Sequence, residues 1–388
     1  MSNARIALLI ETSNAYARGV LEGVTQYIHE HGPWSVYLPE RGRGDAVSGW
    51  LRGWKGDGIL ARAENARIAR AIAATRLPAV DLSAAGLLPR APWVHSDVRA
   101  EAAAAFNHLW DRGFRRLGFC GVSDYRWSRW QCEEFTKLAR ESGCDCQVFE
   151  NPLPADRATA WAAEQRAILR WVKGLPKQVG IFACYDIRGQ QVLEACRAAG
   201  KRVPDDVAVV GVDNDPVRCG LSDPPLSSVI PDTRRVGYQA AELLDAMMSG
   251  RRVKPMPYLI APLGVVTRKS TDALAIDDAD VSAAARFIRD HACEPIGVKH
   301  VLRSVPISRR ALERRFLGAL GRTPHQEILR CRIDKARLLL STTDLPIKAI
   351  AQRVGVGNAE YLSVIFKRIV GSTPASFRRQ HMRGSLRR

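Results

Sequence analysis

The sequence lacks an apolar run long enough to cross a bilayer, for which a helix needs about 20 consecutive apolar residues. Residues 1–19 combine a short apolar run with polar turn residues, and they do not have the composition of a signal peptide. These absences predict a cytoplasmic protein with no membrane partner.

Motifs of several large enzyme classes are also absent. The chain contains no P-loop, no H-E-x-x-H, no G-x-S-x-G and no complete G-x-G-x-x-G, since Gly42-Arg43-Gly44 lacks the third glycine. An exposed carboxylate pair could still perform acid–base chemistry, but no pair stands out. We therefore expect neither enzymatic activity nor a cofactor, with a sugar-processing enzyme as the less favoured alternative.

Paired cysteines are lacking as well. The nine cysteines are an odd number scattered among apolar neighbours, and only Cys144 and Cys146 are close in sequence. A lone C-x-C is a weak signal for metal binding, and this usage is typical of reduced cysteines in the cytosol. We expect no disulfide and no metal site.

Positive charge, in contrast, is abundant and unevenly distributed. The 388 residues have a net charge of +18, and residues 281–388 hold 22 Lys and Arg against 7 Asp and Glu. That part therefore carries +15, and residues 1–280 carry +3. Such a basic block is typical of a protein that binds a polyanion such as DNA, although a solvated tail or an anionic membrane surface would favour the same composition.

Two helix-turn-helix patterns lie within the basic part. Residues 347–377 place apolar side chains at i, i+3, i+4 and i+7 on two short helices. Gly355 suits the left-handed end of the first helix, and Asn358 can cap the second. The same pattern occurs fifty residues earlier with Ser308 in the capping place, and a helix beginning at Pro324 joins the two units.

The order and spacing of these elements resemble the AraC-type DNA-binding domain. The residues that carry the resemblance are Ile307, Ser308, Leu312, Phe316, Arg332, Ala336, Leu339, Leu340, Ile347, Ile350, Ala351, Phe366, Lys367, Thr373, Pro374, Phe377 and Arg378. The resemblance implies an all-α domain over residues 281–388 whose two units each place a recognition helix in a major groove of double-stranded DNA.

The exposed faces of the two recognition helices provide the candidate DNA contacts. These are Ser308, Arg309, Arg310, Glu313 and Arg314 in the first unit, and Asn358, Glu360, Ser363 and Lys367 in the second. Arginine can bind guanine bidentately and glutamate can accept from cytosine N4, although arginines on basic helices often bind phosphate alone. Ala359 and Val364 predict weaker sequence discrimination by the second helix.

Residues 1–268 alternate short apolar runs with amphipathic stretches. The predicted strands are Ile6–Ile10, Gly58–Leu60, Ala79–Leu82, Leu117–Cys120, Val179–Ala183 and Val207–Val212. Short buried strands separated by helices predict an α/β fold with parallel sheets and right-handed crossovers. In such sheets the ligand site lies at the carboxyl ends of the strands.

Residues 95–121, 203–214 and 226–229 resemble LacI/GalR-type effector domains. The resemblance implies the periplasmic-binding-protein fold, in which two α/β lobes are joined by three crossovers and hold a small molecule between them. The implied boundaries are lobe one at about 1–115 and 230–260, lobe two at about 116–229 and 261–268, and a polar linker at 269–280.

A sensor of this type followed by an AraC-type domain resembles a family of xylose-responsive regulators. The supporting residues are Asn14–Tyr16, Arg18, Val20, Glu22–Val24, Gly237–Ala241, Arg268–Asp272 and Ile288–Cys293. The resemblance implies a transcriptional activator with D-xylose or a related monosaccharide as effector. It also implies a homodimer that binds an operator and works with RNA polymerase. A different small molecule, or none, is the alternative.

A sugar pocket needs planar polar groups that bind hydroxyls and an aromatic face for the ring. The candidates are Asn14, Tyr16, Trp127, Arg129, Asp186, Asp213 and Asn214. Asn14 and Asp186 could instead cap helices, and Trp127 could pack in the core. The resemblance implies an arginine where Gln131 stands, so either Arg129 replaces it or the effector differs from xylose.

Overall fold

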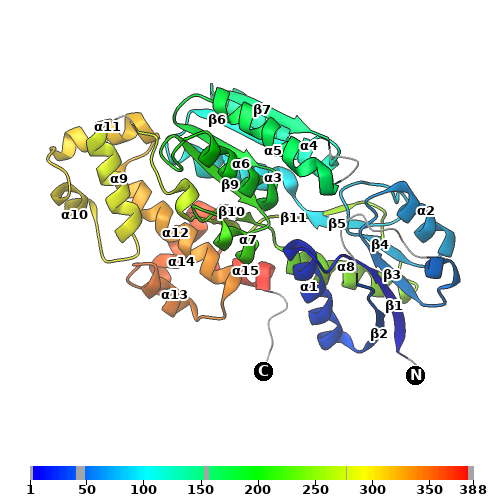
Figure 1. Ribbon diagram of the computed structural model, residues 1–388. Helices are drawn as coiled ribbons and strands as arrows, with labels where there is room; N and C mark the ends of the chain where they lie inside the picture. Colours follow the sequence, from blue (N-terminus) through cyan, green and yellow to red (C-terminus); the bar gives the residue numbers. More distant parts are fainter. Residues whose placement is uncertain (1–2, 41–48, 153–156, 277, 383–388) are drawn as a thin grey trace.

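The computed structural model describes residues 3–40, 49–152, 157–276 and 278–382. They form two α/β lobes followed by a helical domain, which confirms the predicted fold class (Figure 1). Gly42-Arg43-Gly44 lies outside the described residues. Within those residues, no helix is both long and apolar enough to span a bilayer.

The first lobe contains a wholly parallel sheet in the order β11-β5-β4-β3-β1-β2. Its strands are β1 (Ala4–Leu9), β2 (Trp34–Tyr37), β3 (Gly58–Ala61), β4 (Ala79–Asp81), β5 (Trp93–Ser96) and β11 (Pro257–Ile260). Its helices are α1 (Ala15–His31), α2 (Ala66–Thr75), α8 (Thr233–Met248) and the short 3-10 helix η1 (Gly49–Gly53). Central strands such as β1 and β3 are buried apolar runs because helices cover both faces.

The second lobe contains the sheet β12-β10-β9-β8-β6-β7, in which only β12 is antiparallel to its neighbour. Its strands are β6 (Arg116–Val122), β7 (Asp145–Asn151), β8 (Val179–Ala183), β9 (Val207–Val212), β10 (Ser227–Ile230) and β12 (Gly264–Val266). Its helices are α3 (Val98–Trp110), α4 (Arg126–Glu141), α5 (Arg157–Gly174), α6 (Asp186–Ala198) and α7 (Pro216–Leu221). The chain crosses between lobes after β5, β10 and β11, which gives the three predicted crossovers.

Helix α3 belongs to the second lobe, so the predicted boundary at residue 115 was too late. Its buried residues Ala102, Phe106 and Leu109 pack in one core with Phe119 and Phe182 of the second sheet. The apolar face of this alanine-rich helix packs against the second sheet and α4, and the boundary therefore lies just after β5.

The start of the predicted linker is also part of the second lobe. The 3-10 helix η2 (Lys269–Thr271) buries Ser270 and Thr271 completely. Ser270 Oγ donates to the Val209 carbonyl at 2.6 Å and accepts from the Ser227 amide at 2.8 Å. The small polar side chains that predicted a linker instead satisfy buried backbone groups. The connection to the next domain therefore begins after Thr271 and is shorter than the predicted linker at residues 269–280.

The C-terminal domain contains two helix-turn-helix units, as predicted. Its helices are α9 (Ala279–His291), α10 (Val298–Arg303), α11 (Arg309–Leu320), α12 (Pro324–Thr342), α13 (Ile347–Arg353), α14 (Ala359–Val370) and α15 (Pro374–Met382). Ser308 Oγ accepts from the Ala311 amide at 3.3 Å, and Asn358 Oδ1 accepts from the Tyr361 amide at 2.7 Å. Both predicted caps and the left-handed Gly355, with φ of 70°, are therefore confirmed.

Helix α12 joins the two units because it contributes to both of their cores. Ile328 packs in the core of the first unit with Leu312 and Phe316. Leu329 and Ile333 pack in the core of the second unit. A single helix with side chains in two cores fixes the positions of α11 and α14 relative to each other.

Candidate functional site

A cavity of about 390 Å³ lies between the two lobes, within the size range of small-molecule sites. Both lobes contribute to its wall. The lining residues are Ser13, Asn14, Ala15, Tyr16, Arg62, Leu82, Ala84, His95, Ser96, Val98, Glu101, Tyr125, Trp127, Gln131, Trp161, Glu164, Cys184, Tyr185, Ile187, Gln191, Val212, Asp213, Asp215 and Arg218. Several follow strand ends, where a parallel sheet places its ligand.

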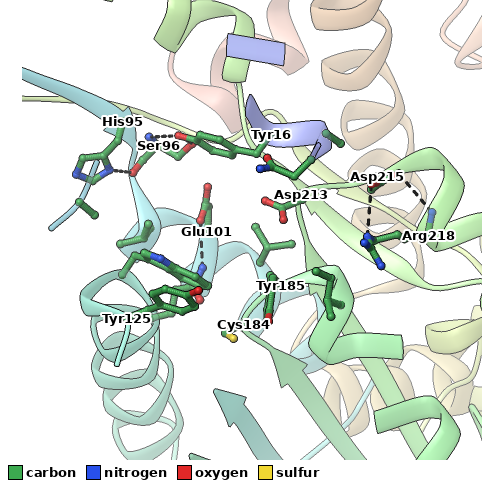
Figure 2. A pocket seen from close by; sticks show the side chains of 18 of the residues that line it. Tyr16, His95, Ser96, Glu101, Tyr125, Cys184, Tyr185, Asp213, Asp215 and Arg218 are labelled. Atoms are coloured by element: carbon green, nitrogen blue, oxygen red, sulfur yellow. Dashed lines mark hydrogen bonds and ion pairs between the residues drawn. The ribbon is translucent and has the colours of Figure 1, made fainter. Parts of the chain in front are cut away.

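The first lobe contributes Asn14 and Tyr16 from the start of α1. Asn14 Oδ1 accepts from the Ala17 amide at 2.8 Å, so this residue caps α1 and also lines the cavity. The Tyr16 hydroxyl accepts hydrogen bonds from Ser96, at 3.3 Å from the backbone N and 3.2 Å from Oγ (Figure 2). Burial raises the pKa of Tyr16, which keeps the phenol neutral.

Aromatic rings form one wall of the cavity. Tyr125 and Trp127 stack with ring centroids 5.0 Å apart, and Tyr185 packs edge-on against Trp127 at 5.7 Å. Trp161 of α5 also lines the cavity, although 60% of its surface is exposed. Flat aromatic surfaces of this kind suit the apolar face of a sugar ring.

Glu101 and Gln131 are polar groups deep in the cavity. Gln131 Nε2 donates to Glu101 Oε2 at 3.2 Å, and the two residues are 1–2% exposed. Burial, followed by the charge of Asp213, raises the pKa of Glu101 to about 8. Glu101 lies near the centre of the cavity in Figure 2, between the side chains of the two lobes.

His95 is a neutral side chain in the wall. Its Nδ1 lies against the carbonyl oxygen of Ser96, which can only accept, so Nδ1 carries the proton and Nε2 does not. Burial lowers the pKa of His95 to about 4, which keeps the imidazole uncharged at neutral pH.

Four of the seven predicted effector contacts line the cavity, namely Asn14, Tyr16, Trp127 and Asp213. Asp213 has a φ of 104°, a conformation that costs side-chain-bearing residues about 1–3 kcal/mol and is concentrated at functional sites. Gln131, noted as a departure from the family pattern, also lines the cavity.

Arg129, Asp186 and Asn214 do not line the cavity. Arg129 is exposed and donates to the Ser123 carbonyl at 2.6 Å, so it does not take the place of the missing arginine. Asp186 is buried and accepts from Ser228 Oγ at 2.6 Å and from the Asp215 amide at 2.8 Å.

Asn214 accepts from Arg268 Nη2 at 2.8 Å. Like Asp186, its side chain is therefore bonded to another segment of the second lobe and does not face the cavity.

Sequence reasoning missed Glu101, His95 and Arg218 in the cavity wall. A signal existed for Glu101, which is a carboxylate inside an alanine-rich buried helix and four residues after the capping Asp97. Acidic residues are seldom fully buried without a partner or a function. His95 and Arg218 carried no comparable signal.

The recognition helices present the predicted polar faces. Arg309, Arg310 and Arg314 of α11 are exposed, and Arg309 Nε is 2.9 Å from Glu313 Oε1. On α14, Glu360 and Lys367 are exposed, whereas Ser363 Oγ donates to the Ala359 carbonyl of its own helix at 2.8 Å.

Ser308 and Asn358 serve as helix caps. Val364 and Tyr361 of α14 are 64% and 47% exposed, so apolar surface occupies part of the face of α14.

The second lobe and the helical domain meet at Asp111, the C-cap residue of α3. Its carboxylate pairs with Arg322 at 2.9 Å and with Arg330 at 3.1 Å, and its carbonyl accepts from Arg289 at 2.9 Å. Glu327, fully buried, lies 2.5 to 3.6 Å from the same three arginines. Although burial raises the pKa of Glu327, the arginines together hold it well below its usual range.

Comparisons with known proteins agree with this architecture. Family models match residues 5–94 (XylR N-terminal domain), 106–271 (periplasmic binding protein-like domain) and 302–380 (helix-turn-helix domain). Over 384 residues, 34% are identical to the xylose operon regulatory protein of Escherichia coli (strain K12), with 96% of both chains covered. The Haemophilus influenzae protein of the same name is 32% identical, covering 96% of this chain and 98% of that one. This chain belongs to the xylose operon regulatory protein family.

Solved structures extend the comparison. The structure of a "xylose-binding transcription activator xylR" is similar to that of this chain, with a TM-score of 0.63 and 32% sequence identity. The match covers 98% of this chain and 99% of that one. The complex of the transcriptional regulator CelR with cellobiose has a TM-score of 0.57 at 22% identity, covers 70% and 86% of the two chains, and shows the fold of the sensor alone. As a member of the xylose operon regulatory protein family, the chain is a transcription regulator with a helix-turn-helix DNA-binding domain.

Glu101→Gln should stabilise the ligand-free protein at about pH 9 and have a much smaller effect at about pH 5. Glu101 titrates near pH 4.3 in the unfolded chain and at about 8 in the folded protein. The folded state therefore holds a proton that the unfolded state has lost, and wild-type stability falls as pH rises between these values. Glutamine does not titrate, so the difference should grow with pH.

Chemical denaturation of both proteins across this range measures the effect. The buried Asp81, with its pKa raised to about 7, changes the stability of both proteins alike and cancels in the difference. A stability difference that stays constant with pH would contradict the assignment.

Proposed function

We propose that this transcription regulator binds a neutral monosaccharide, D-xylose or a close relative, between its two lobes and thereby controls its binding to operator DNA as an activator of sugar-utilisation genes. The observation that carries the proposal is the cavity between the lobes, which combines hydroxyl-binding polar groups with an aromatic wall. The xylose-binding protein of similar structure supports the choice of sugar.

For DNA, we propose that α11 and α14 enter successive major grooves on one face of the duplex, about 34 Å apart. The exposed arginines of α11 support base contacts by that helix. Helix α14, with its exposed Val364, would contribute backbone and apolar contacts and discriminate less between sequences. The charge of +15 on residues 281–388 supports attraction to the phosphate backbone.

The proposed mechanism is closure of the lobes on the sugar, followed by a change in the placement of the DNA-binding domains. A ligand can shift this equilibrium only if its affinities for the two states differ, so sugar and DNA must affect each other's binding equally. The contact at Asp111 supports this path because it joins the second lobe directly to α9 and α12.

We further propose that the protein acts as a cytoplasmic homodimer, contacts RNA polymerase, and works by binding alone, without turnover or a cofactor. Two copies would present four recognition helices, and pseudo-symmetric half-sites would then follow from the symmetry of the dimer. Among the described residues, no group of His, Cys, Asp or Glu is arranged to hold a metal ion.

A panel of aldopentoses, hexoses and polyols, read by thermal shift, tests the proposed effector. At 100 times its dissociation constant a ligand of the folded state adds about 2.7 kcal/mol of stability, which is readily detected. We expect D-xylose or a related pentose to raise the melting temperature most. No shift with any member would contradict a sugar effector, and conversion of a bound sugar would favour an enzyme.

Arg310→Ala should weaken binding to a selected operator by about 1–3 kcal/mol and relax base preference at one position, if the arginine binds guanine bidentately. Fluorescence anisotropy with operator and random duplexes measures both effects. Arg170→Ala removes the same charge from the exposed surface of α5 and is the matched control. Equal weakening on both duplexes would assign Arg310 to phosphate contact instead.

A further inference from the structure

The deepest polar groups of the cavity have unmet hydrogen-bonding capacity. Glu101 Oε1 and Gln131 Oε1 are buried and have no hydrogen-bond partner, although Glu101 Oε2 is bound by Gln131 Nε2. A buried polar atom without a partner costs about 1–3 kcal/mol, and most folded proteins contain few. Both side chains line the cavity, so a bound molecule is the partner that can satisfy them.

His95 of the same wall also has an unmet atom, on the side of its ring that faces away from Glu101 in Figure 2. His95 Nε2 is buried without a partner, and it is an acceptor because Nδ1 carries the proton. Gln131 Oε1 is likewise an acceptor. A molecule that satisfies Gln131 Oε1 and the ionised form of Glu101 must donate hydrogen bonds from more than one place, which is characteristic of a polyhydroxylated compound.

The charges around the cavity favour a neutral ligand over an anionic one. Four carboxyl groups line it, namely Glu101, Glu164, Asp213 and Asp215, against the two arginines Arg62 and Arg218. Arg62 is already paired with Glu11 at 3.0 Å and Glu64 at 2.7 Å. Arg188 pairs with Glu164 at 2.9 Å, and Arg218 lies 3.8 Å from Asp215. A sugar phosphate or sugar acid would add negative charge to a lining in which the arginines already have carboxylate partners, so a neutral ligand is favoured.

We infer that Glu101, positioned by Gln131, is a specificity-determining residue that binds one particular hydroxyl of a neutral sugar. This inference rests on the proposed function, since it concerns the ligand of the same cavity. Glu101 reaches the ligand from α3 of the second lobe and lies opposite Tyr16 of the first lobe (Figure 2). It therefore contacts a ligand held between the two lobes.

A hydroxyl suits Glu101 better than other polar groups do. The raised pKa of this carboxyl, about 8, leaves both protonation states accessible near neutral pH. An ionised carboxylate accepts from a hydroxyl, and a protonated carboxyl donates to one, so a hydroxyl satisfies both states. An ammonium group satisfies only the ionised state and a carboxylate ligand only the protonated one.

Calorimetric titration of the full-length protein with D-xylose and its monodeoxy analogues tests the inference. In the wild type, loss of the hydroxyl that Glu101 binds should weaken affinity by about 10- to 100-fold, the range expected when a buried partner is left unpaired. In Glu101→Ala, D-xylose itself should bind more weakly, and that one analogue should bind within about threefold of D-xylose. The other analogues should keep their wild-type penalties.

Two variants keep the test interpretable. Glu101→Gln retains the shape and hydrogen-bonding groups of the side chain, so it should keep part of the discrimination between D-xylose and the one weakened analogue. It also shows whether the fold tolerates a substitution at this position. Glu133→Ala removes a carboxylate from the exposed surface of α4 and should leave every affinity unchanged. Circular dichroism verifies folding of each variant.

The two proposals fail in different ways. Binding by the wild type with the same pattern of analogue penalties in Glu101→Ala would overturn the role of Glu101 and leave the proposed function standing. No binding of D-xylose or of any sugar in the panel by the wild type would overturn the proposed function and this inference together.

Discussion

The position of the helical domain against the sensor depends on one constraint. Charged side chains buried at their junction must be paired with opposite charges. Glu327 is fully buried, and a buried carboxylate stays ionised only when it is paired. Its partners Arg289, Arg322 and Arg330 also bind Asp111 of the sensor. Because the arginines cannot leave Asp111 without leaving charge uncompensated, the first helix-turn-helix unit is held against the second lobe.

Helix α3 connects this junction to the cavity. Glu101, near its beginning, lies in the cavity wall, and Asp111 ends the helix among the arginines. Ten positions along a helix correspond to about 15 Å, and a packed helix transmits displacement along its axis with little bending. A sugar that moves α3 relative to the first lobe would therefore also move the arginine cluster. One helix thus carries both the proposed effector contact and the contact with the helical domain.

The sequence predicted the features that depend on local patterns. Apolar runs identified β1, β3, β4, β6, β8 and β9, and caps such as Asn358 and Ser308 located the helix-turn-helix units. Short or half-exposed strands such as β2 and β7 lack such runs and were missed. Strand-end position, together with the resemblance to effector domains, predicted Asp213 in the cavity wall.

The same strand-end criterion also selected Asp186 and Asn214. Their side chains instead accept hydrogen bonds from other residues of the second lobe. The lobe membership of α3, and with it the position of Glu101, depends on packing between segments far apart in sequence. No local pattern specifies such packing.

The central claim is that the sugar site and the DNA-binding domain are energetically coupled. The most direct test is the affinity for D-xylose measured with and without saturating selected operator DNA. The account predicts that DNA changes sugar affinity, by the same factor by which sugar changes DNA affinity, typically about 5- to 150-fold. Identical sugar affinities in the two measurements would contradict the account.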